Sequence, residues 1–328
     1  MKLFKDKRGV VLILVLSMVA LFSAMIVNFS SDEGLDIELA YNFRDSIQAQ
    51  YITMAGVEAA KVILSQDDAG YDSLDGQWAE FPVFAATAST YLEGGQLTGT
   101  ITDECSKFDL NSLAIKNSYS DFRKQQFKNL FTVLNIDITS EELDDLTNSI
   151  IDWESATGEV SIGGAKDEYY QSLEPPYHCK NGPMDSIEEI MLVKGMKKEY
   201  FFGTENYEGI RNFITVCPEK TPASGKININ TASETVLRSI SDHFTEDVVN
   251  NIVACRPFKG SDFSCARGLD LTDSSPETTW IKSTLVVMKS TRFSVDVTGK
   301  MPSGALINVK AVLERISNNP RIVYYRIY

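Results

Sequence analysis

The junction at Gly9, where a short basic leader meets an apolar run, constrains this chain more than any other feature. The run covers residues 10–27 and contains no charged residue. A helix needs roughly 20 residues, at ~1.5 Å each, to cross the hydrocarbon core of a bilayer. We therefore predict that residues 10–27 form the membrane-spanning part of a helix.

The charges that flank this run predict its orientation. Basic residues precede it, namely Lys2, Lys5, Lys7 and Arg8, and acidic residues follow it, namely Asp32, Glu33, Asp36 and Glu38. Basic flanks stay on the cytoplasmic side, so the bulk of the chain is expected outside the cytoplasm. A cleaved secretory signal would carry a small-x-small site and a helix break, and neither is present. Because no proline occurs before Pro82, one helix is expected from Val10 to Leu64.

This start resembles the signal of type IV pilins and of the pseudopilins of type II secretion. The resemblance implies that a prepilin peptidase cleaves between Gly9 and Val10, that Val10 becomes methylated, and that the protein is a single-pass inner-membrane protein with its C-terminal bulk in the periplasm. Most members carry a glutamate at the fifth mature position, where this chain has Leu14. A carboxylate in an apolar helix is costly unless a partner charge neutralises it. The K-type minor pseudopilins are the members that lack this glutamate.

The remainder of the chain shows two kinds of pattern. Residues 96–104 alternate apolar and polar, and three β-branched and aromatic runs follow residue 283, separated by turn-like segments. We expect about four antiparallel strands packed on the first helix, reached through an irregular connection over residues 65–89. The predicted fold is α+β, with a pilin-like long N-terminal helix on an antiparallel sheet.

A helical pattern separates these strands. Thr139 with Glu142 and Ser186 with Glu189 have the spacing of capping boxes, and a third helix is expected from Asn230 or Thr231. We interpret this region as a large inserted all-α domain similar to SAM and helix-hairpin-helix domains. The predicted divisions are the leader peptide 1–9, the membrane span 10–27, the rest of the helix with the first part of the pilin-like domain 28–106, the inserted domain 107–282 and the C-terminal strands 283–328.

Four segments in this order resemble the general secretion pathway protein K family: DECSKFDLNSL, SIIDWESATGEVSIGGAKDEYY, NGPMDSIEEIMLVKGM and GKININTASETVL. The resemblance implies a minor pseudopilin at the tip of the type II secretion pseudopilus that helps to initiate assembly and supports export of folded proteins across the outer membrane. Its implied partners are the I-type and J-type minor pseudopilins, other pseudopilins, the prepilin peptidase and the inner membrane. The alternative is a minor pilin of a type IV or competence pilus.

Nucleic acid is not an expected partner. The segment from residue 226 to 240 resembles a helix-hairpin-helix motif, which binds phosphates through glycine-rich turns. Here the turn from Ser241 to Phe244 has no glycine and contains Asp242, and the whole chain has a net charge of −14. Such a turn repels phosphate, so we expect a packing role.

The loop from residue 152 to 168 is the best metal candidate. It contains Asp152, Glu154, Asp167 and Glu168, and calcium takes six to eight oxygen ligands from flexible acidic loops. The K-type family is associated with calcium in its helical domain, but Ser155, Ala156 and Thr157 stand where many members have more aspartates. Two interpretations remain open: a calcium site formed by some of these four carboxylates, and a solvated acidic loop.

Neither the cysteines nor the histidines indicate catalysis. Cys255 and Cys265 are near enough in sequence to close a short disulfide loop, and Cys179 with Cys217 is a second possibility, but sequence does not fix the pairing. His178 and His243 have no nucleophile motif near them, and there is no phosphate-binding or dinucleotide-binding glycine pattern. We expect a protein that is not an enzyme and requires no cofactor, with calcium as the one candidate ligand.

Overall fold

A computed structural model describes residues 7–67, 70–217, 225–259, 263–284, 289–316 and 319–328. Its α-helices are α1 (Lys7–Gln66), α2 (Phe81–Ser89), α3 (Ser120–Val133), α4 (Ser140–Glu154), α5 (Asp167–Gln171), α6 (Lys198–Phe202), α7 (Glu234–Ile240), α8 (Glu246–Cys255) and α9 (Pro276–Thr284). The strands are β1 (Gln96–Asp103), β2 (Phe108–Asp109), β3 (Ile214–Thr215), β4 (Arg292–Lys300), β5 (Leu306–Ile316) and β6 (Asn319–Ile327). Short 3-10 helices are η1 (Gln77–Glu80), η2 (Glu104–Ser106), η3 (Leu110–Ser112), η4 (Ile187–Leu192) and η5 (Ile210–Asn212).

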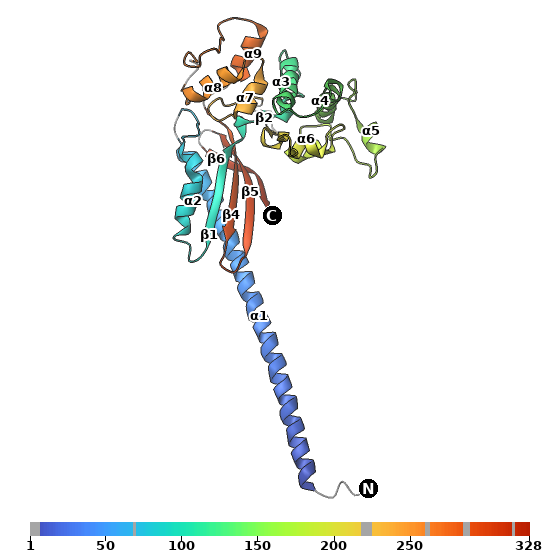
Figure 1. Ribbon diagram of the computed structural model, residues 1–328, viewed down its shortest axis with the longest axis vertical. Helices are drawn as coiled ribbons and strands as arrows, with labels where there is room; N and C mark the ends of the chain where they lie inside the picture. Colours follow the sequence, from blue (N-terminus) through green and yellow to red (C-terminus); the bar gives the residue numbers. More distant parts are fainter. Residues whose placement is uncertain (1–6, 68–69, 218–224, 260–262, 285–288, 317–318) are drawn as a thin grey trace.

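The long helix α1 dominates the shape of the molecule. Its first half projects alone from the body, and its second half packs against the sheet (Figure 1). The helical part formed by α3–α9 lies beyond the end of the sheet, at the opposite end of the molecule from the start of α1. By length and composition, α1 is apolar enough to cross a membrane, and its most apolar window contains no buried residue.

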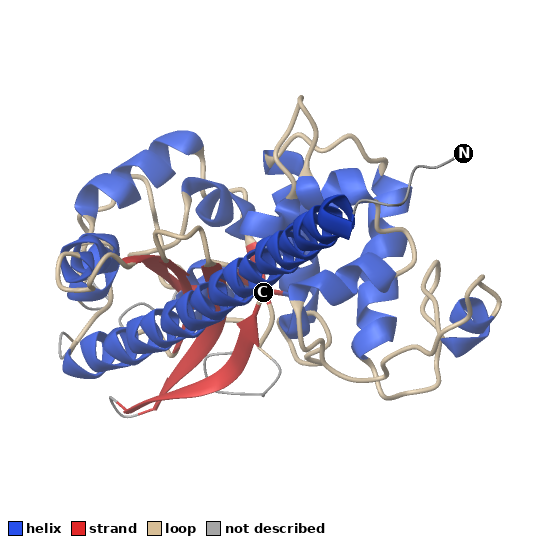
Figure 2. Cartoon of the chain, turned by 90° about the horizontal axis from the view of Figure 1, so that it is seen from below, coloured by secondary structure: helices blue, strands red, loops and turns tan. Residues whose placement is uncertain are grey.

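One antiparallel sheet of four strands carries the first core. The strand order is β1-β4-β5-β6, so the strand before the helical part pairs with β4 after it. Buried side chains on one face, including Val295, Val297 and Ala311, pack against Val57 and Leu64 of α1. Each buried valine or leucine in this set contributes about 1.5–3 kcal/mol. In Figure 2 the long helix crosses this sheet obliquely.

The helical part has a separate and larger core. Phe127, Phe131, Leu146, Trp153 and Trp280 are among its buried residues. Both predicted capping boxes are present, at Thr139 with Glu142 and at Ser186 with Glu189. The capping pattern in the sequence therefore identifies the start of α4 correctly, at the cap Thr139.

The predicted α+β fold is confirmed, while several details differ. The supposedly irregular stretch 65–89 contains η1 and α2, since Pro82 occupies the first turn of a helix that buries Phe81 and Ala85. The segment after Ser186 forms the 3-10 helix η4, and the inserted region also contains the parallel strand pair β2–β3, so it is not wholly α-helical.

Two predicted boundaries also shift. The third helix begins after the cap Ser233 and not at Asn230 or Thr231, because the side chains of Asn230 and Thr231 bond elsewhere, to the Phe258 carbonyl and the Asp103 carboxylate. Thr284, expected in a strand, ends α9. Residues 1–6 of the predicted leader lie outside the described residues.

Candidate functional site

The predicted processing junction lies within the first turns of α1. Gly9 and Val10 are both helical, and a Cβ atom added at Gly9 would have no neighbour within 4 Å. Leu14 is 52% exposed on the projecting half of the helix. This half therefore presents an uncovered apolar surface with no carboxylate at position 14.

The predicted calcium ligands do not converge on one point. The Asp152 carboxylate accepts hydrogen bonds from the backbone N–H and hydroxyl of Ser161, at 2.9 and 2.7 Å. The Asp167 carboxylate accepts from the Cys179 N–H at 2.6 Å, while Glu168 is exposed. Among the described residues, no three His, Cys, Asp or Glu side chains are arranged to hold a metal ion. The carboxylates instead tie the loop to itself and to the segment around Cys179.

Two lysine side chains already supply positive charge to this loop. The buried Lys166 ammonium donates to the Ser155 carbonyl and to Asn181 Oδ1, the latter at 2.8 Å. Lys194 donates to the Gly163 carbonyl at 3.0 Å. Carbonyl oxygens are among the ligands that calcium uses, and here two of them accept from ammonium groups. The residues present thus fit an internally neutralised loop better than a metal cage.

Glu154 differs from the other three candidate carboxylates in its surroundings, and its side chain is buried in the helical part. Glu154 is 6% exposed, and neither of its carboxylate oxygens has a hydrogen-bond partner among the described residues. Burial raises the pKa of Glu154 well above its usual value, and the Asp109 charge adds to the rise. Burial likewise raises the pKa of Asp109 to about 6. An unpaired buried carboxylate of this kind favours its neutral form.

The segment similar to a helix-hairpin-helix motif packs inward. Leu237 and Ile240 of α7 and Val249 and Ile252 of α8 are all buried in the core of the helical part. A disulfide joins Cys255 at the end of α8 to Cys265, with an S–S length of 2.02 Å. Cys105, Cys179 and Cys217 carry free thiols, so the second pairing considered from sequence, Cys179 with Cys217, is not formed.

A buried polar cluster, which the sequence did not reveal, joins the helical part to the sheet. Asp103 of β1 accepts hydrogen bonds from Asn228, Thr231 and Ser290, at 3.1, 2.6 and 2.6 Å. Burial raises the pKa of Asp103 to about 6. We call these four residues the seam cluster. Asn228 and Thr231 come from the helical part, so the cluster fixes that part on the sheet.

An ion-pair group borders the seam cluster. Arg315 of β5 pairs with Asp72 and, at 3.4 Å, with Asp67. The Asn228 side chain also donates to the Asp72 carbonyl, at 3.3 Å, which connects the two groups. A buried charge pair is costly to break, because it leaves one charge uncompensated. The loop after α1 is therefore held against both the sheet and the helical part.

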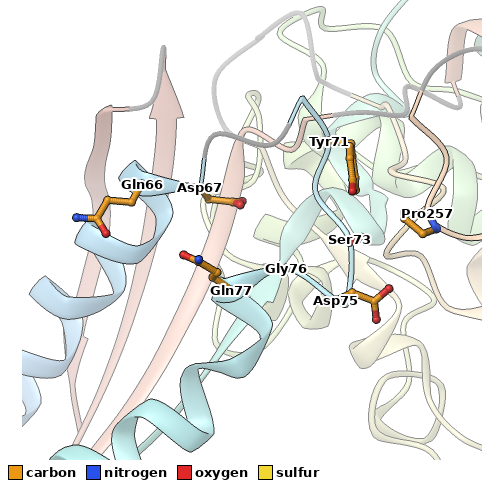
Figure 3. Close-up of a pocket in the computed structure, with 8 residues that line it drawn as sticks. All are labelled: Gln66, Asp67, Tyr71, Ser73, Asp75, Gly76, Gln77 and Pro257. Carbon is orange, nitrogen blue, oxygen red and sulfur yellow. The ribbon is translucent and has the colours of Figure 1, made fainter.

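A polar pocket of about 400 Å³ opens beside this loop. Its lining comprises Gln66, Asp67, Tyr71, Ser73, Asp75, Gly76, Gln77 and Pro257. Figure 3 shows Gln66 and Gln77 on one side and Pro257 on the other. Burial, with the neighbouring Asp72, raises the pKa of Asp67 to about 6. None of the residues predicted as sites from sequence lines this pocket, and we assign no ligand to it.

The two histidines lie in separate surroundings. His178 Nδ1 is 3.7 Å from Asp167, and His243 Nε2 is 3.7 Å from Glu277. Both imidazoles are mostly exposed. The Ser241 hydroxyl donates to Glu277 at 2.5 Å and not to the His243 imidazole, so its proton is directed away from the base that would activate it. The arrangement at either histidine is that of a surface contact.

Comparison with known proteins gives consistent matches. The sequence family described as type II secretion system (T2SS), protein K, matches residues 106–219, a range that includes α3–α6. Type II secretion system protein K of Aeromonas hydrophila is 28% identical over 271 residues, covering 77% of this chain and 76% of the relative. A putative type II secretion system protein K of Escherichia coli K12 is 27% identical over 238 residues, covering 70% of this chain and 67% of the relative.

A solved structure has a similar fold. It is a chain from the crystal structure of the GspK–GspI–GspJ complex of the enterotoxigenic E. coli type 2 secretion system, with a TM-score of 0.70 and 19% identity. The match covers 88% of this chain and 99% of that chain. The similarity therefore extends over most of this chain and nearly all of the solved chain.

Proposed function

We propose that this chain, a member of the type II secretion system protein K family, is the tip subunit of the pseudopilus. As a minor pseudopilin of this system, it would help to initiate filament assembly and support the export of folded proteins across the outer membrane. The observation that carries the proposal is the placement of α3–α9 beyond the end of the sheet, away from the start of α1 (Figure 1). If subunits stack with their long helices parallel, this part blocks any subunit above it.

Leu14 supports the same position. A subunit whose neighbour lies only below it has no amino terminus above to neutralise, so it needs no carboxylate in the apolar half of α1. The uncovered apolar surface of residues 10–27 would then serve first as the inner-membrane anchor and later as a packing surface for other pseudopilin helices. The helical and sheet parts would lie in the periplasm.

A gene deletion separates this proposal from the alternative of a type IV or competence pilus. We expect secreted enzymes to accumulate in the periplasm while surface pili stay unchanged. Restoration of secretion by the wild-type chain is the control. Normal secretion with loss of pili would reject the type II assignment.

We also propose that the prepilin peptidase cleaves between Gly9 and Val10 and that Val10 is then methylated. The expected mature protein has a methylated Val10 as its first residue, which mass spectrometry of the purified chain measures. Expression without the peptidase should leave the leader attached. A mature terminus beyond Val27 in the presence of the peptidase would contradict the proposal.

The proposed partners are the I-type and J-type minor pseudopilins. Support comes from the fold, since the solved neighbour of the same fold was crystallised in a complex with GspI and GspJ. We expect both subunits to co-purify with the full-length chain from detergent-solubilised membranes, whereas an unrelated single-pass protein should recover neither.

A further inference from the structure

Strand β6 lies at the outer side of the sheet and pairs with β5 alone within the described part of the chain. Large apolar side chains are exposed on both of its faces. Tyr325 is opposite Ala311 on the helix side, Tyr324 is opposite Val312 on the far side, and each tyrosine is 39% exposed. Ile327, on the helix side, is 45% exposed. Such an open and apolar edge strand is normally covered, since it otherwise promotes aggregation.

The outer edge of β6 offers free backbone groups. The N–H of Tyr328 donates to the carbonyl of Asn308, and the N–H of Asn308 donates to the carbonyl of Tyr328, at 3.0 and 3.2 Å. Hydrogen-bonded pairs alternate along an antiparallel ladder. The backbone groups of Arg326 therefore face β5, whereas those of Tyr325 and Ile327 face away from the sheet. An added strand would satisfy these outward groups.

Features that hinder the pairing of another strand with β6 are confined to its first half. Pro320 lies near its start, and a register irregularity lies between Val312 and Leu313 of β5. Prolines and bulges both hinder edge pairing. The second half, residues 324–327, has regular pairing to β5 and no proline. The accessible pairing segment is therefore residues 324–327.

Charge across the sheet indicates what would bind there. Asp296 of β4 is opposite Lys310 of β5, and Lys310 is opposite Arg326 of β6. Like charges directly opposite each other are unfavourable. Lys310 has Asp296 beside it, whereas Arg326 has no acidic partner among the described residues. A carboxylate on an added strand would continue the alternation of charge across the sheet.

A second copy of β6 does not meet this requirement. Residues 319–328 contain two arginines and no acidic residue, so pairing of two such strands would place basic edges together. The occupant is therefore a different polypeptide with an acidic residue.

We propose that residues 324–327 of β6 form a docking edge for an extended segment of a partner pseudopilin. The segment would pair with the outward backbone groups of Tyr325 and Ile327 and place a carboxylate beside Arg326. The identity of the partner as an I-type or J-type subunit rests on the proposed function, while the location of the edge does not.

The test is co-purification of the full-length chain with co-expressed I-type and J-type subunits from solubilised membranes. Ile327→Pro removes an outward N–H, whereas the control Ile327→Ala removes side-chain area but keeps that N–H. Arg326→Glu reverses the charge, and Arg267→Glu makes the same change at an exposed position in the helical part. We expect Ile327→Pro and Arg326→Glu to lower recovery of one subunit by about tenfold and the two controls to lower it much less.

Melting of each variant shows whether it folds, and if Ile327→Pro does not fold, Arg326→Glu carries the test. Wild-type recovery with both test variants would overturn the edge proposal and leave the proposed function intact. If the wild-type chain recovers neither subunit, the proposed partners are wrong. The proposal that one of them binds the edge of β6 is then also wrong. A photo-crosslinker at position 324 should form its adduct on an extended, acid-containing segment, and an adduct on a partner helix would also overturn the proposal.

Discussion

Single residues in the helical part carry electrostatic costs that sequence patterns do not show. Glu154 follows Trp153 at the end of α4, where an acidic residue suggests a solvated helix end. In the fold, the Glu154 carboxylate is buried and lies near Asp109, which comes from a distant part of the chain. Its partners come from distant segments, so no local pattern could predict its raised pKa.

We expect Glu154→Gln to stabilise the protein at neutral pH. A folded-state pKa above the unfolded value means that stability is greatest below the unfolded pKa, near 4.5, and is lost as pH rises through the folded pKa. Glutamine removes this loss, so the melting temperature at pH 7.5 should rise by a few degrees and its fall between pH 5 and pH 7.5 should become smaller. Thermal melting at both pH values, with exposed Glu168→Gln as the control, measures this. An unchanged pH dependence would contradict it.

Lys166 and Lys194 make a second prediction at this scale. Since their ammonium groups already bind carbonyl oxygens of the acidic loop, we expect a calcium chelator to leave the melting temperature unchanged. Lys166→Met should destabilise the chain by about 1–3 kcal/mol, because it leaves the Ser155 carbonyl and Asn181 amide oxygen without their donor. Exposed Lys198→Met is the control. A fall in melting temperature on chelation would instead support the calcium site.

At the scale of elements, α1 approaches the sheet closely because glycines face it. A Cβ atom on Gly299 of β4 would lie 2.5 Å from the Ala49 carbonyl oxygen, and one on Gly56 of α1 would lie 2.7 Å from Val297. Real Cβ atoms do not come so near to other atoms. A larger residue in place of either glycine would therefore push the helix away from the sheet. We expect Gly299→Val to destabilise the chain by about 1–3 kcal/mol, whereas Gly158→Val, in open space, should change little. Equal melting temperatures for the two variants would contradict this packing argument.

Elements with strong local patterns were predictable and those set by distant contacts were not. The apolar run after Gly9 predicted α1, and Thr139 with Glu142 predicted the start of α4. In contrast, Asn230 and Thr231 resemble a helix cap in sequence, yet their side chains bond Phe258 and Asp103 across the fold. The parallel pair β2–β3 has only two residues in each strand, too few for a visible alternation.

At the scale of the whole molecule, two separate cores meet at a polar seam. Asn228 donates to Asp103 at 3.1 Å and to Ser290 at 2.8 Å, and its own N–H bonds the Cys105 carbonyl. Hydrogen bonds are directional, whereas apolar contact is not. The seam cluster can therefore set the angle between the helical part and the sheet.

We expect Asn228→Ala to weaken this connection while both cores stay folded. The substitution leaves Asp103 buried with fewer donors, at a cost of about 2–3 kcal/mol. Because each part keeps its own apolar cluster, the single melting transition should broaden or divide, and trypsin should cleave faster at Lys226 beside the seam. Asn251→Ala, which removes an exposed bond to the Asp247 carbonyl on the same helix, is the control. If Asn228→Ala melts and is cleaved like the wild type, apolar contact alone holds the two parts together, and the seam cluster has no role in their orientation.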